Sequence, residues 1–144
     1  MGKILIIKTS SLGDIVHNLP VISDICRNLP GSSIDWLVEE AYQPLVRLHP
    51  GVGLVVPVSM RRWRRQPFAA GTWREIGALR RFLAENPYDS IIDTQGLFKS
   101  AVLAAAARGR RHGYDTASAR EPIAACLYDV RHAVSRSMHA VVRN

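Results

Sequence analysis

The sequence predicts an α/β fold in which a parallel β-sheet carries helices on both faces. Three observations indicate this fold. Short apolar runs rich in β-branched residues alternate along the chain with longer segments whose apolar positions follow helical spacing. The first run, residues 3–8, is apolar at four consecutive positions, which is typical of a strand buried on both faces. Polar turns separate the segments, as expected where crossover helices join parallel strands.

The helix after the first strand is expected to extend from Leu12 to Leu29, where apolar positions recur at helical spacing. Asn18 is predicted to cap its regular part and Pro20 to begin it, because proline is favoured in the first helical turn. The pattern then predicts, in order, a second strand over residues 33–38, a short helix over 41–48 and a third strand over 52–58.

Pro57 favours an edge position for the third strand, because proline cannot donate a hydrogen bond within a sheet. Residues 59–71 are expected to form a basic loop. Thr72 is predicted to cap the next helix, with Glu75 at capping-box spacing. The remaining elements are expected to be that helix over 72–85, a strand over 88–93, an alanine-rich helix over 97–107, a strand over 110–114 and a last helix over 120–128.

The composition fits one globular domain. The 144 residues are 47% hydrophobic and 22% charged, which is enough for a core without metal or disulfide support. The net charge of +7 and the pI near 10.1 indicate a polyanionic partner: nucleic acid, an acidic membrane surface, or a phosphorylated or carboxylated ligand. The strand pattern at the start predicts no signal peptide, and no apolar run reaches membrane-spanning length, so any membrane contact is expected to be peripheral.

The cysteines and histidines suggest no metal or redox centre. Cys26 and Cys126 form no C-x-x-C motif, so free, buried thiols in a reducing compartment are expected. His112, His132 and His139 lack partners at useful spacing and are expected to be structural or exposed.

Asp14 is the first candidate functional residue. It follows the first strand and the polar turn Thr9-Ser10-Ser11, and ligands of open α/β sheets collect beyond the carboxyl ends of the strands. The same residues also fit a structural role, in which a hydroxyl caps the next helix and Asp14 is a favourable charge in its first turn. The turn has neither the dinucleotide-binding glycine pattern nor a P-loop. Spacing alone leaves both interpretations open.

Positive charge concentrates in the sequence RRWRR after the third strand. Its guanidinium groups repel one another, so the segment is expected to be mobile unless an anion binds. Guanidinium groups bind carboxylates and phosphates through two parallel hydrogen bonds, which suits a multiply charged ligand. The alternative is a solvated basic loop. The arginines are Arg61, Arg62, Arg64 and Arg65.

A second strand-to-helix junction follows Asp93. Gly96 permits close approach, and Gln95 and Lys99 can hydrogen-bond a polyhydroxylated ligand. Ordinary turn chemistry explains the same residues. Arg120, near the start of the last predicted helix, is either a ligand contact or a salt-bridge residue.

Together these junctions resemble the N-terminal half of the lipopolysaccharide heptosyltransferases, and the type I group in particular, which are two-domain glycosyltransferases of the GT-B type. KTSSLGD alone suggests only the wider family, whereas RRWRR and DTQGLFKS after it make the resemblance specific. The matching segments are residues 8–20, 35–40, 57–65, 91–101, 112–115, 119–124 and 138–141.

The resemblance implies a Rossmann-like fold and a single N-terminal, acceptor-binding domain over residues 1–144, without the C-terminal nucleotide-sugar domain. The implied reaction is inverting, metal-independent transfer of heptose from ADP-heptose to the Kdo of Kdo2-lipid A. It implies no cofactor, because ADP-heptose is the donor substrate and is bound mainly by the C-terminal domain. It also implies a cytoplasmic enzyme, peripheral at the bacterial inner membrane, with no nucleic-acid partner. The 144 residues alone are expected to be inactive.

The resemblance also implies roles for the candidate residues. Asp14 would act as catalytic base. The four arginines, Arg61, Arg62, Arg64 and Arg65, would bind Kdo carboxylates or lipid A phosphates. The rest of the acceptor cleft would be lined by Lys8, Ser10, Gln95, Lys99 and Arg120.

Two alternatives without catalysis remain open. One is a basic α/β module that binds an anionic glycolipid or nucleic acid, although the sequence lacks a recognisable reading helix, RNP-like strand or zinc finger. The other is a peripheral membrane protein that uses Trp63, Phe68 and the arginines on anionic lipid.

Overall fold

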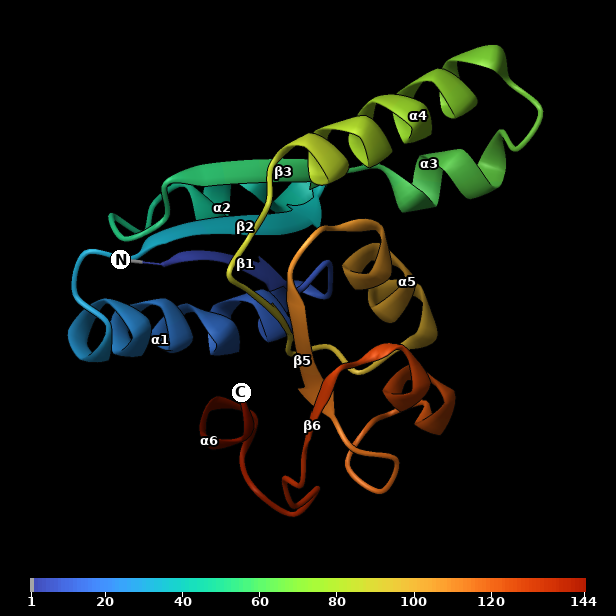
Figure 1. Ribbon diagram of the computed structural model, residues 1–144. Coiled ribbons are helices and arrows are strands. Elements are labelled where there is room, and N and C mark those ends of the chain that lie inside the picture. The colour runs from blue at the N-terminus through green and yellow to red at the C-terminus, as the bar shows by residue number, and fades with distance from the viewer. Residues whose placement is uncertain (1) are drawn as a thin grey trace.

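The computed structural model describes residues 2–144 and confirms the predicted fold class. Its sheet has six strands in the order β3-β2-β1-β4-β5-β6, and all neighbouring strands pair in parallel (Figure 1). The strands are β1 (Lys3–Ile7), β2 (Ser33–Glu39), β3 (Leu54–Val58), β4 (Ser90–Asp93), β5 (Arg110–Tyr114) and β6 (Val130–His132).

Helices cover both faces of the sheet because the strands at its centre are apolar on both sides. On β1, Ile4 and Ile6 belong to one buried core and Leu5 and Ile7 to the other, as the alternation of side chains along a strand requires. The helical segments are α1 (Leu12–Asn28), η1 (Glu40–Tyr42), α2 (Gln43–Val46), α3 (Met60–Arg65), α4 (Ala70–Glu85), α5 (Phe98–Ala106), η2 (Pro122–Leu127) and α6 (Ala140–Arg143).

Helix α1 is continuous, so the prediction of a cap at Asn18 is wrong. The helix begins after Ser11 and passes through Pro20. Ile15 and Ile22, on either side of the proline, are both fully buried against the sheet, and this packing holds the two halves in one helix despite the missing hydrogen bond. Asn18 is buried, and its Oδ1 accepts a hydrogen bond of 2.8 Å from Thr94 Oγ1.

The basic segment is helical, so the prediction of a loop over residues 59–71 is wrong. RRWRR lies in α3, and α4 begins at Ala70, two residues earlier than predicted. Thr72 does not cap α4; its hydroxyl donates to the Gln66 carbonyl across the connection between the helices (2.8 Å). Tertiary contacts between the two helices therefore replace the local capping that the sequence pattern suggested.

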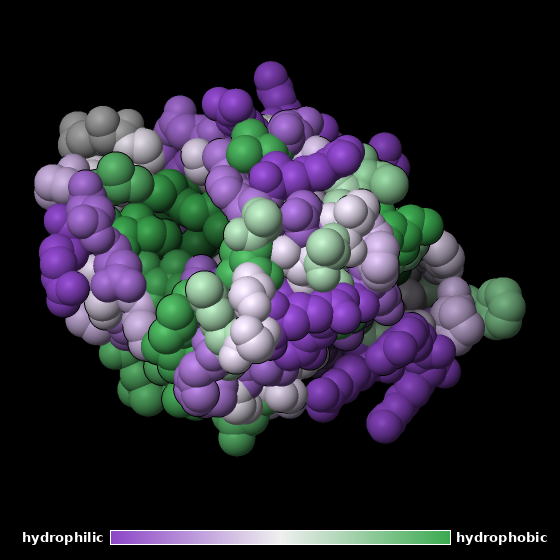
Figure 2. Space-filling model, turned by 90° about the horizontal axis from the view of Figure 1, so that it is seen from below, coloured by the Kyte–Doolittle hydropathy of each residue, from purple (hydrophilic) through white to green (hydrophobic). Residues whose placement is uncertain are grey.

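The C-terminal third differs most from the prediction. The last predicted helix is the short 3-10 segment η2, while β6 and α6 were not predicted because each is only three or four residues long. Figure 2 shows the face that carries this part of the chain, with apolar side chains gathered in a hollow surrounded by polar ones.

Two further predictions from the sequence can be compared with the structure. β3 is an edge strand, as Pro57 indicated. Cys26 and Cys126 are free as predicted, but both are exposed rather than buried. Across residues 2–144, no helix combines the length and the apolar character that crossing a membrane would require.

Candidate functional site

The candidate site lies at the carboxyl ends of β1 and β4, the two central strands. These strands are neighbours, with Ile7 opposite Asp93, although their connections run to opposite halves of the sheet. Ligands of doubly wound α/β folds bind at this reversal of strand order. A hollow of about 100 Å³ opens there. Its lining includes Lys8, Asp14, Thr94, Gln95, Tyr114, Arg120, Arg136 and Arg143.

Asp14 both caps helix α1 and faces this hollow. Its Oδ2 accepts hydrogen bonds from the Ser11 amide and the Ser11 hydroxyl, each 3.0 Å long. Its Oδ1 lies 3.4 Å from Arg120 Nη2, and the side chain is 23% exposed. The two interpretations left open by the sequence are therefore compatible: one oxygen fixes the carboxylate and the other is turned toward the hollow.

The surroundings of Asp14 favour its charged form. Partial burial raises the pKa of this carboxyl, but the Ser11 hydrogen bonds and the charges of Arg120 and Lys8 outweigh that effect, so the pKa lies below its usual value. An ionised carboxylate can accept a proton from a bound hydroxyl group.

Lys8 is buried beneath the hollow. Its Nζ donates a 2.7 Å hydrogen bond to the Thr94 carbonyl, which joins the turn after β1 to the turn after β4. Burial lowers the pKa of Lys8 to about 8, and the nearby charge of Asp14 only partly opposes this effect. Trp36, at the core of β2, donates from Nε1 to the Lys8 carbonyl (3.1 Å) and fixes the backbone at this point.

Gln95 holds the turn after β1 in place. Its Oε1 accepts hydrogen bonds of 2.8 Å from both the amide and the hydroxyl of Thr9. The side-chain carbonyl is thus already engaged, while the residue still lines the hollow. Gly96 follows with φ +67°, and a Cβ atom there would come within 2.9 Å of the Tyr114 ring. The close approach that Gly96 permits is to Tyr114.

Asp93 anchors the same turn from below. Its Oδ1 accepts from the Gln95 amide (2.8 Å), and its Oδ2 accepts a 2.6 Å hydrogen bond from the Tyr128 hydroxyl. Burial raises the pKa of the Asp93 carboxyl, and these hydrogen bonds offset the effect only in part. The buried carboxyl positions the backbone of the site and does not reach the hollow's lining.

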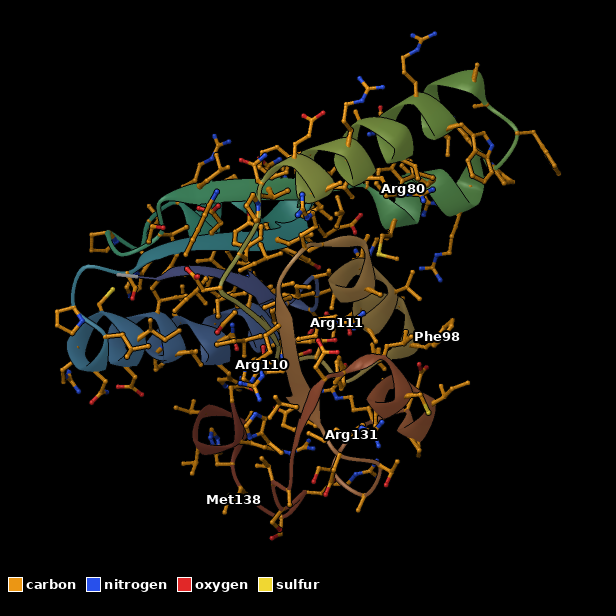
Figure 3. The ribbon with its side chains drawn as sticks, viewed as in Figure 1. Arg80, Phe98, Arg110, Arg111, Arg131 and Met138 are labelled. Carbon is orange, nitrogen blue, oxygen red and sulfur yellow. The ribbon has the colours of Figure 1, made fainter. Side chains whose placement is uncertain are left out.

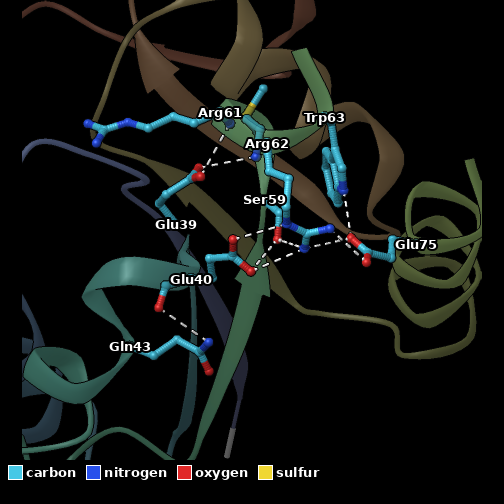
Figure 4. A network of polar contacts seen from close by, with 9 residues as sticks. Glu39, Glu40, Gln43, Ser59, Arg61, Arg62, Trp63 and Glu75 are labelled. Atoms are coloured by element: carbon cyan, nitrogen blue, oxygen red, sulfur yellow. Dashed lines mark hydrogen bonds and ion pairs between the residues drawn. The ribbon is translucent and has the colours of Figure 1, made fainter. Parts of the chain in front are cut away.

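The four arginines do not form one group. Arg62 lies between two glutamates: its Nη2 is 3.2 Å from Glu40 Oε2 and 2.9 Å from Glu75 Oε2. In Figure 4 the Arg61 side chain extends away from this network, and Arg61 Nη2 contacts the Tyr42 hydroxyl (3.3 Å). Arg61, Arg64 and Arg65 line an open hollow of about 530 Å³ of their own.

The arginine hollow and the Asp14 hollow are therefore separate, but they lie at the same edge of the sheet. α3 follows the carboxyl end of β3, and β2 separates β3 from β1. Two strand spacings correspond to about 10 Å. A ligand with several anionic groups can span such a distance.

Ser10 and Lys99 are predicted site residues that line neither the Asp14 hollow nor the arginine hollow. Ser10 is half-buried in the turn after β1, and Lys99 is half-buried in the first turn of α5. Neither lines the hollow that contains Asp14. Phe98, beside Lys99, is exposed and points outward from α5 (Figure 3).

Sequence reasoning missed the contribution of the C-terminal segment. Arg136 and Arg143 line the Asp14 hollow, and the Arg143 guanidinium lies 4.7 Å from the centroid of the Tyr114 ring. No spacing pattern marks these residues, because Arg136 lies in the irregular stretch after β6 and Arg143 ends the four-residue helix α6. The excess of arginine near the end of the chain was the only available signal.

His132 is exposed and His112 is half-buried, in line with the expectation, but the two rings are partners across the sheet although no spacing in the sequence indicated it. Neighbouring strands β5 and β6 place His112 Nδ1 3.3 Å from His132 Nε2, with the rings stacked. Partial burial and the neighbouring His132 lower the pKa of His112. Within residues 2–144, no cluster of three or more histidine, cysteine or acidic side chains could hold a metal ion.

Several known proteins are similar to this chain in sequence. Residues 76–144 match the family described as glycosyltransferase family 9 (heptosyltransferase). The chain is 44% identical over 142 residues to the lipopolysaccharide heptosyltransferase 1 of Salmonella typhimurium, covering 98% of this chain and 45% of that protein. For the protein of the same name from Pseudomonas aeruginosa, the identity is 42%, with 98% and 40% covered.

A solved structure agrees with these matches. The structure of E. coli heptosyltransferase WaaC with ADP superposes with a TM-score of 0.94 at 43% identity, covering 98% of this chain and 44% of that one. The chain thus spans less than half of the length of the curated relatives it matches. Along 98% of its length, the chain is therefore similar to less than half of a heptosyltransferase of glycosyltransferase family 9.

Proposed function

We propose that residues 1–144 form the acceptor-binding domain of a heptosyltransferase that moves heptose from ADP-heptose to the Kdo of Kdo2-lipid A in the synthesis of the lipopolysaccharide inner core. The observation that carries the proposal is the setting of Asp14. A carboxylate held in its ionised form lines a hollow with four cationic groups, those of Lys8, Arg120, Arg136 and Arg143.

In this mechanism Asp14 is the catalytic base. It takes the proton from an acceptor hydroxyl as that oxygen bonds to the anomeric carbon of the heptose. The bond between the anomeric carbon and the diphosphate oxygen breaks in the same displacement, so the configuration inverts and ADP leaves. The donor is bound mainly by a second domain that residues 1–144 do not include, so these residues alone are expected to be inactive.

The cationic groups would hold the acceptor by its negative charges. Arg120, at the rim of the Asp14 hollow, would bind a Kdo carboxylate, with Lys8 and Gln95 fixing the turns behind it. The exposed Arg61, Arg64 and Arg65 would bind a second anionic group, on Kdo or on a lipid A phosphate. Ser10 and Lys99 would contact the acceptor outside the Asp14 hollow, and Arg62 would act through its ion pairs with Glu40 and Glu75.

The acceptor is a membrane lipid, so we propose a cytoplasmic protein that works at the inner-membrane surface and does not bind nucleic acid. This proposal predicts that the affinity for Kdo2-lipid A greatly exceeds the affinity for an oligonucleotide at equal salt. Equal affinities would favour the non-catalytic basic module, because any basic surface binds polyanions weakly.

The sharpest test of the mechanism is Asp14→Asn in the full-length protein. We expect transfer from ADP-heptose to Kdo2-lipid A to fall by at least about 100-fold, in line with loss of a general base, while the Kd of the acceptor changes little. Asp24→Asn is the matched control, because Asp24 lies on the same helix, is exposed and pairs only with Arg27. Full turnover by Asp14→Asn would rule out this carboxylate as the base.

A further inference from the structure

The α3–α4 hairpin projects from the body of the protein (Figure 1). Its base packs on the core through Trp63, Leu79 and Phe82, and the ion pair of Arg62 with Glu75 joins its two helices. The residues of its tip, 64–68, are all exposed.

The tip holds an aromatic ring out toward solvent. Phe68 is 97% exposed, the highest value among the large apolar side chains of residues 2–144. The loop around it is nonetheless ordered by its own hydrogen bonds: the Gln66 carbonyl accepts from the Ala69 amide at 3.2 Å and from the Thr72 hydroxyl at 2.8 Å. A single exposed ring is ordinary on a protein surface, so Phe68 is informative only together with a second apolar side chain near it.

Trp73 lies beside this loop, and its indole N–H group is already hydrogen-bonded within the protein. Its indole is 63% exposed, yet its Nε1 donates a 2.8 Å hydrogen bond to the Pro67 carbonyl. An indole N–H without a partner resists transfer into an apolar phase, and here that group is already satisfied within the loop. The remaining ring surface can leave water without losing a hydrogen bond.

The surroundings of the two rings are strongly basic. Residues 60–74 contain five arginines and no acidic residue. Among residues 2–144, the carboxylates form no ion pair within 4.0 Å of Arg64, Arg65 or Arg74. Exposed aromatic side chains surrounded by arginines suit the interface of an anionic bilayer. There, aromatic side chains insert below the headgroups and cationic side chains bind the lipid phosphates.

We propose that the hairpin tip docks on an anionic phospholipid surface, with Phe68 and Trp73 inserted and Arg64, Arg65 and Arg74 on the lipid phosphates. The inference deepens the proposed function, because it places the Arg61–Arg64–Arg65 hollow next to the membrane in which the acceptor would lie. It requires no Kdo, so it can be tested separately.

The test measures binding of the protein to vesicles of phosphatidylethanolamine with phosphatidylglycerol, compared with phosphatidylcholine alone, by sedimentation at low and high salt. We expect salt-sensitive binding to the anionic vesicles only. Phe68→Ser should weaken it about tenfold, since part of a phenyl ring no longer leaves water. Arg64→Gln and Arg65→Gln should each weaken it about fivefold at low salt.

Matched controls separate insertion from general effects. Leu48→Ser removes a largely exposed apolar side chain (78%) outside the hairpin, and Arg108→Gln removes an exposed arginine far along the chain. Both should bind like the unmodified protein. Lipids brominated in the acyl chain should quench Trp73 in the unmodified protein and should quench more strongly in Phe68→Trp, whereas Trp36, fully buried, should not respond.

Three outcomes would overturn the inference. They are equal binding to neutral and anionic vesicles, unchanged binding by Phe68→Ser, and a dimer that Phe68→Ser dissociates without any binding to lipid. The outcome also separates this inference from the proposed function. Phe68→Ser in the full-length protein should leave transfer to a soluble, deacylated acceptor unchanged. If Phe68→Ser loses vesicle binding but keeps full transfer, docking by the hairpin tip is supported. If the unmodified protein binds vesicles but shows no transfer, only the enzyme assignment is refuted.

Discussion

Arg120 Nη2 lies 3.4 Å from Asp14 Oδ1, although 106 residues separate them in the sequence. The contact joins the first turn of α1 to the segment before η2, and it exists because β1 and β4 are neighbours in the sheet. A cation supplied by the second half of the domain therefore adds to the Ser11 hydrogen bonds in lowering the pKa of a carboxyl group supplied by the first half.

Removing this cation should change the titration of Asp14. Arg120→Gln is expected to raise the pKa of the Asp14 carboxyl toward its usual value, because a favourable charge interaction with the carboxylate is lost. The Ser11 hydrogen bonds remain, so the shift should be partial. Carboxyl ¹³C NMR titration of Asp14 measures it, with Arg27→Gln, which removes an exposed cation from the last turn of α1, as the control. An unchanged Asp14 titration would show that the 3.4 Å contact has no electrostatic effect.

Lys8 should give the protein an unusual dependence of stability on pH. The pKa of Lys8 is lowered to about 8 in the folded protein, whereas an unperturbed lysine, as in the unfolded chain, has a pKa of 10.5. Between these two pH values the unfolded chain holds a proton that the folded chain lacks. The free energy of unfolding should therefore rise with pH across this window, by about 3 kcal/mol in total.

Lys8→Met should abolish that rise. The comparison is made by urea unfolding of both proteins at several pH values from 8 upward. Tyr88 and Tyr128 act in the opposite sense near the top of the window, because burial raises their pKa values, but they do so in both proteins. Parallel curves for the two proteins would contradict the prediction.

Arg62 and Arg64 should behave differently despite their similar positions in RRWRR. Arg62→Gln removes both ion pairs, to Glu40 and Glu75, and should speed hydrogen exchange in α3 with a small decrease in the melting temperature. Arg64→Gln should change neither the hydrogen exchange of α3 nor the melting temperature. It should instead raise the KM for the acceptor in the full-length protein.

The stability contribution of the Arg62 network should also depend on pH. The hydrogen bonds from Arg62 lower the pKa values of Glu40 and Glu75, so their contribution is complete at neutral pH and is lost as the pH falls through these lowered values. The difference in melting temperature between the unmodified protein and Arg62→Gln should therefore shrink in acid. A difference that grows in acid would contradict the assignment.

Tyr128→Phe should destabilise the fold by about 1–3 kcal/mol, because the buried Asp93 carboxyl loses the hydroxyl that donates to it at 2.6 Å. Denaturant unfolding measures the change. Tyr42→Phe is the control, since Tyr42 is half-buried and its hydroxyl meets only the exposed Arg61. Equal effects of the two substitutions would mean that the Asp93 contact contributes nothing specific.

Local patterns were sufficient for the central elements. The apolar run of β1, the β-branched run of β3 with Pro57 at the sheet edge, and the alanine-rich α5 all lie where periodicity placed them. Each of these elements is defined by burial of its own side chains, and burial leaves a pattern in the sequence. The resemblance, which rested on motifs in the right order, was confirmed at the level of the family.

Local patterns failed where contacts between distant residues decide the structure. Thr72 and Glu75 have capping-box spacing, but Glu75 binds Arg62 of α3 instead, and RRWRR becomes a helix because glutamates from two other segments neutralise part of its charge. Pro20 was expected to begin a helix, yet the sheet on which Ile15 and Ile22 pack carries the helix through it.

The sequence by itself determined the sheet, its alternating helices and the presence of Asp14 beyond a buried strand, because hydrophobic periodicity records which side chains avoid water. Only the tertiary structure decided that Asp14 meets Arg120, Arg136 and Arg143, and that Arg62 separates from the other arginines of its run. Such contacts depend on strand order and on the path of irregular segments, and neither leaves a periodic signal in the chain.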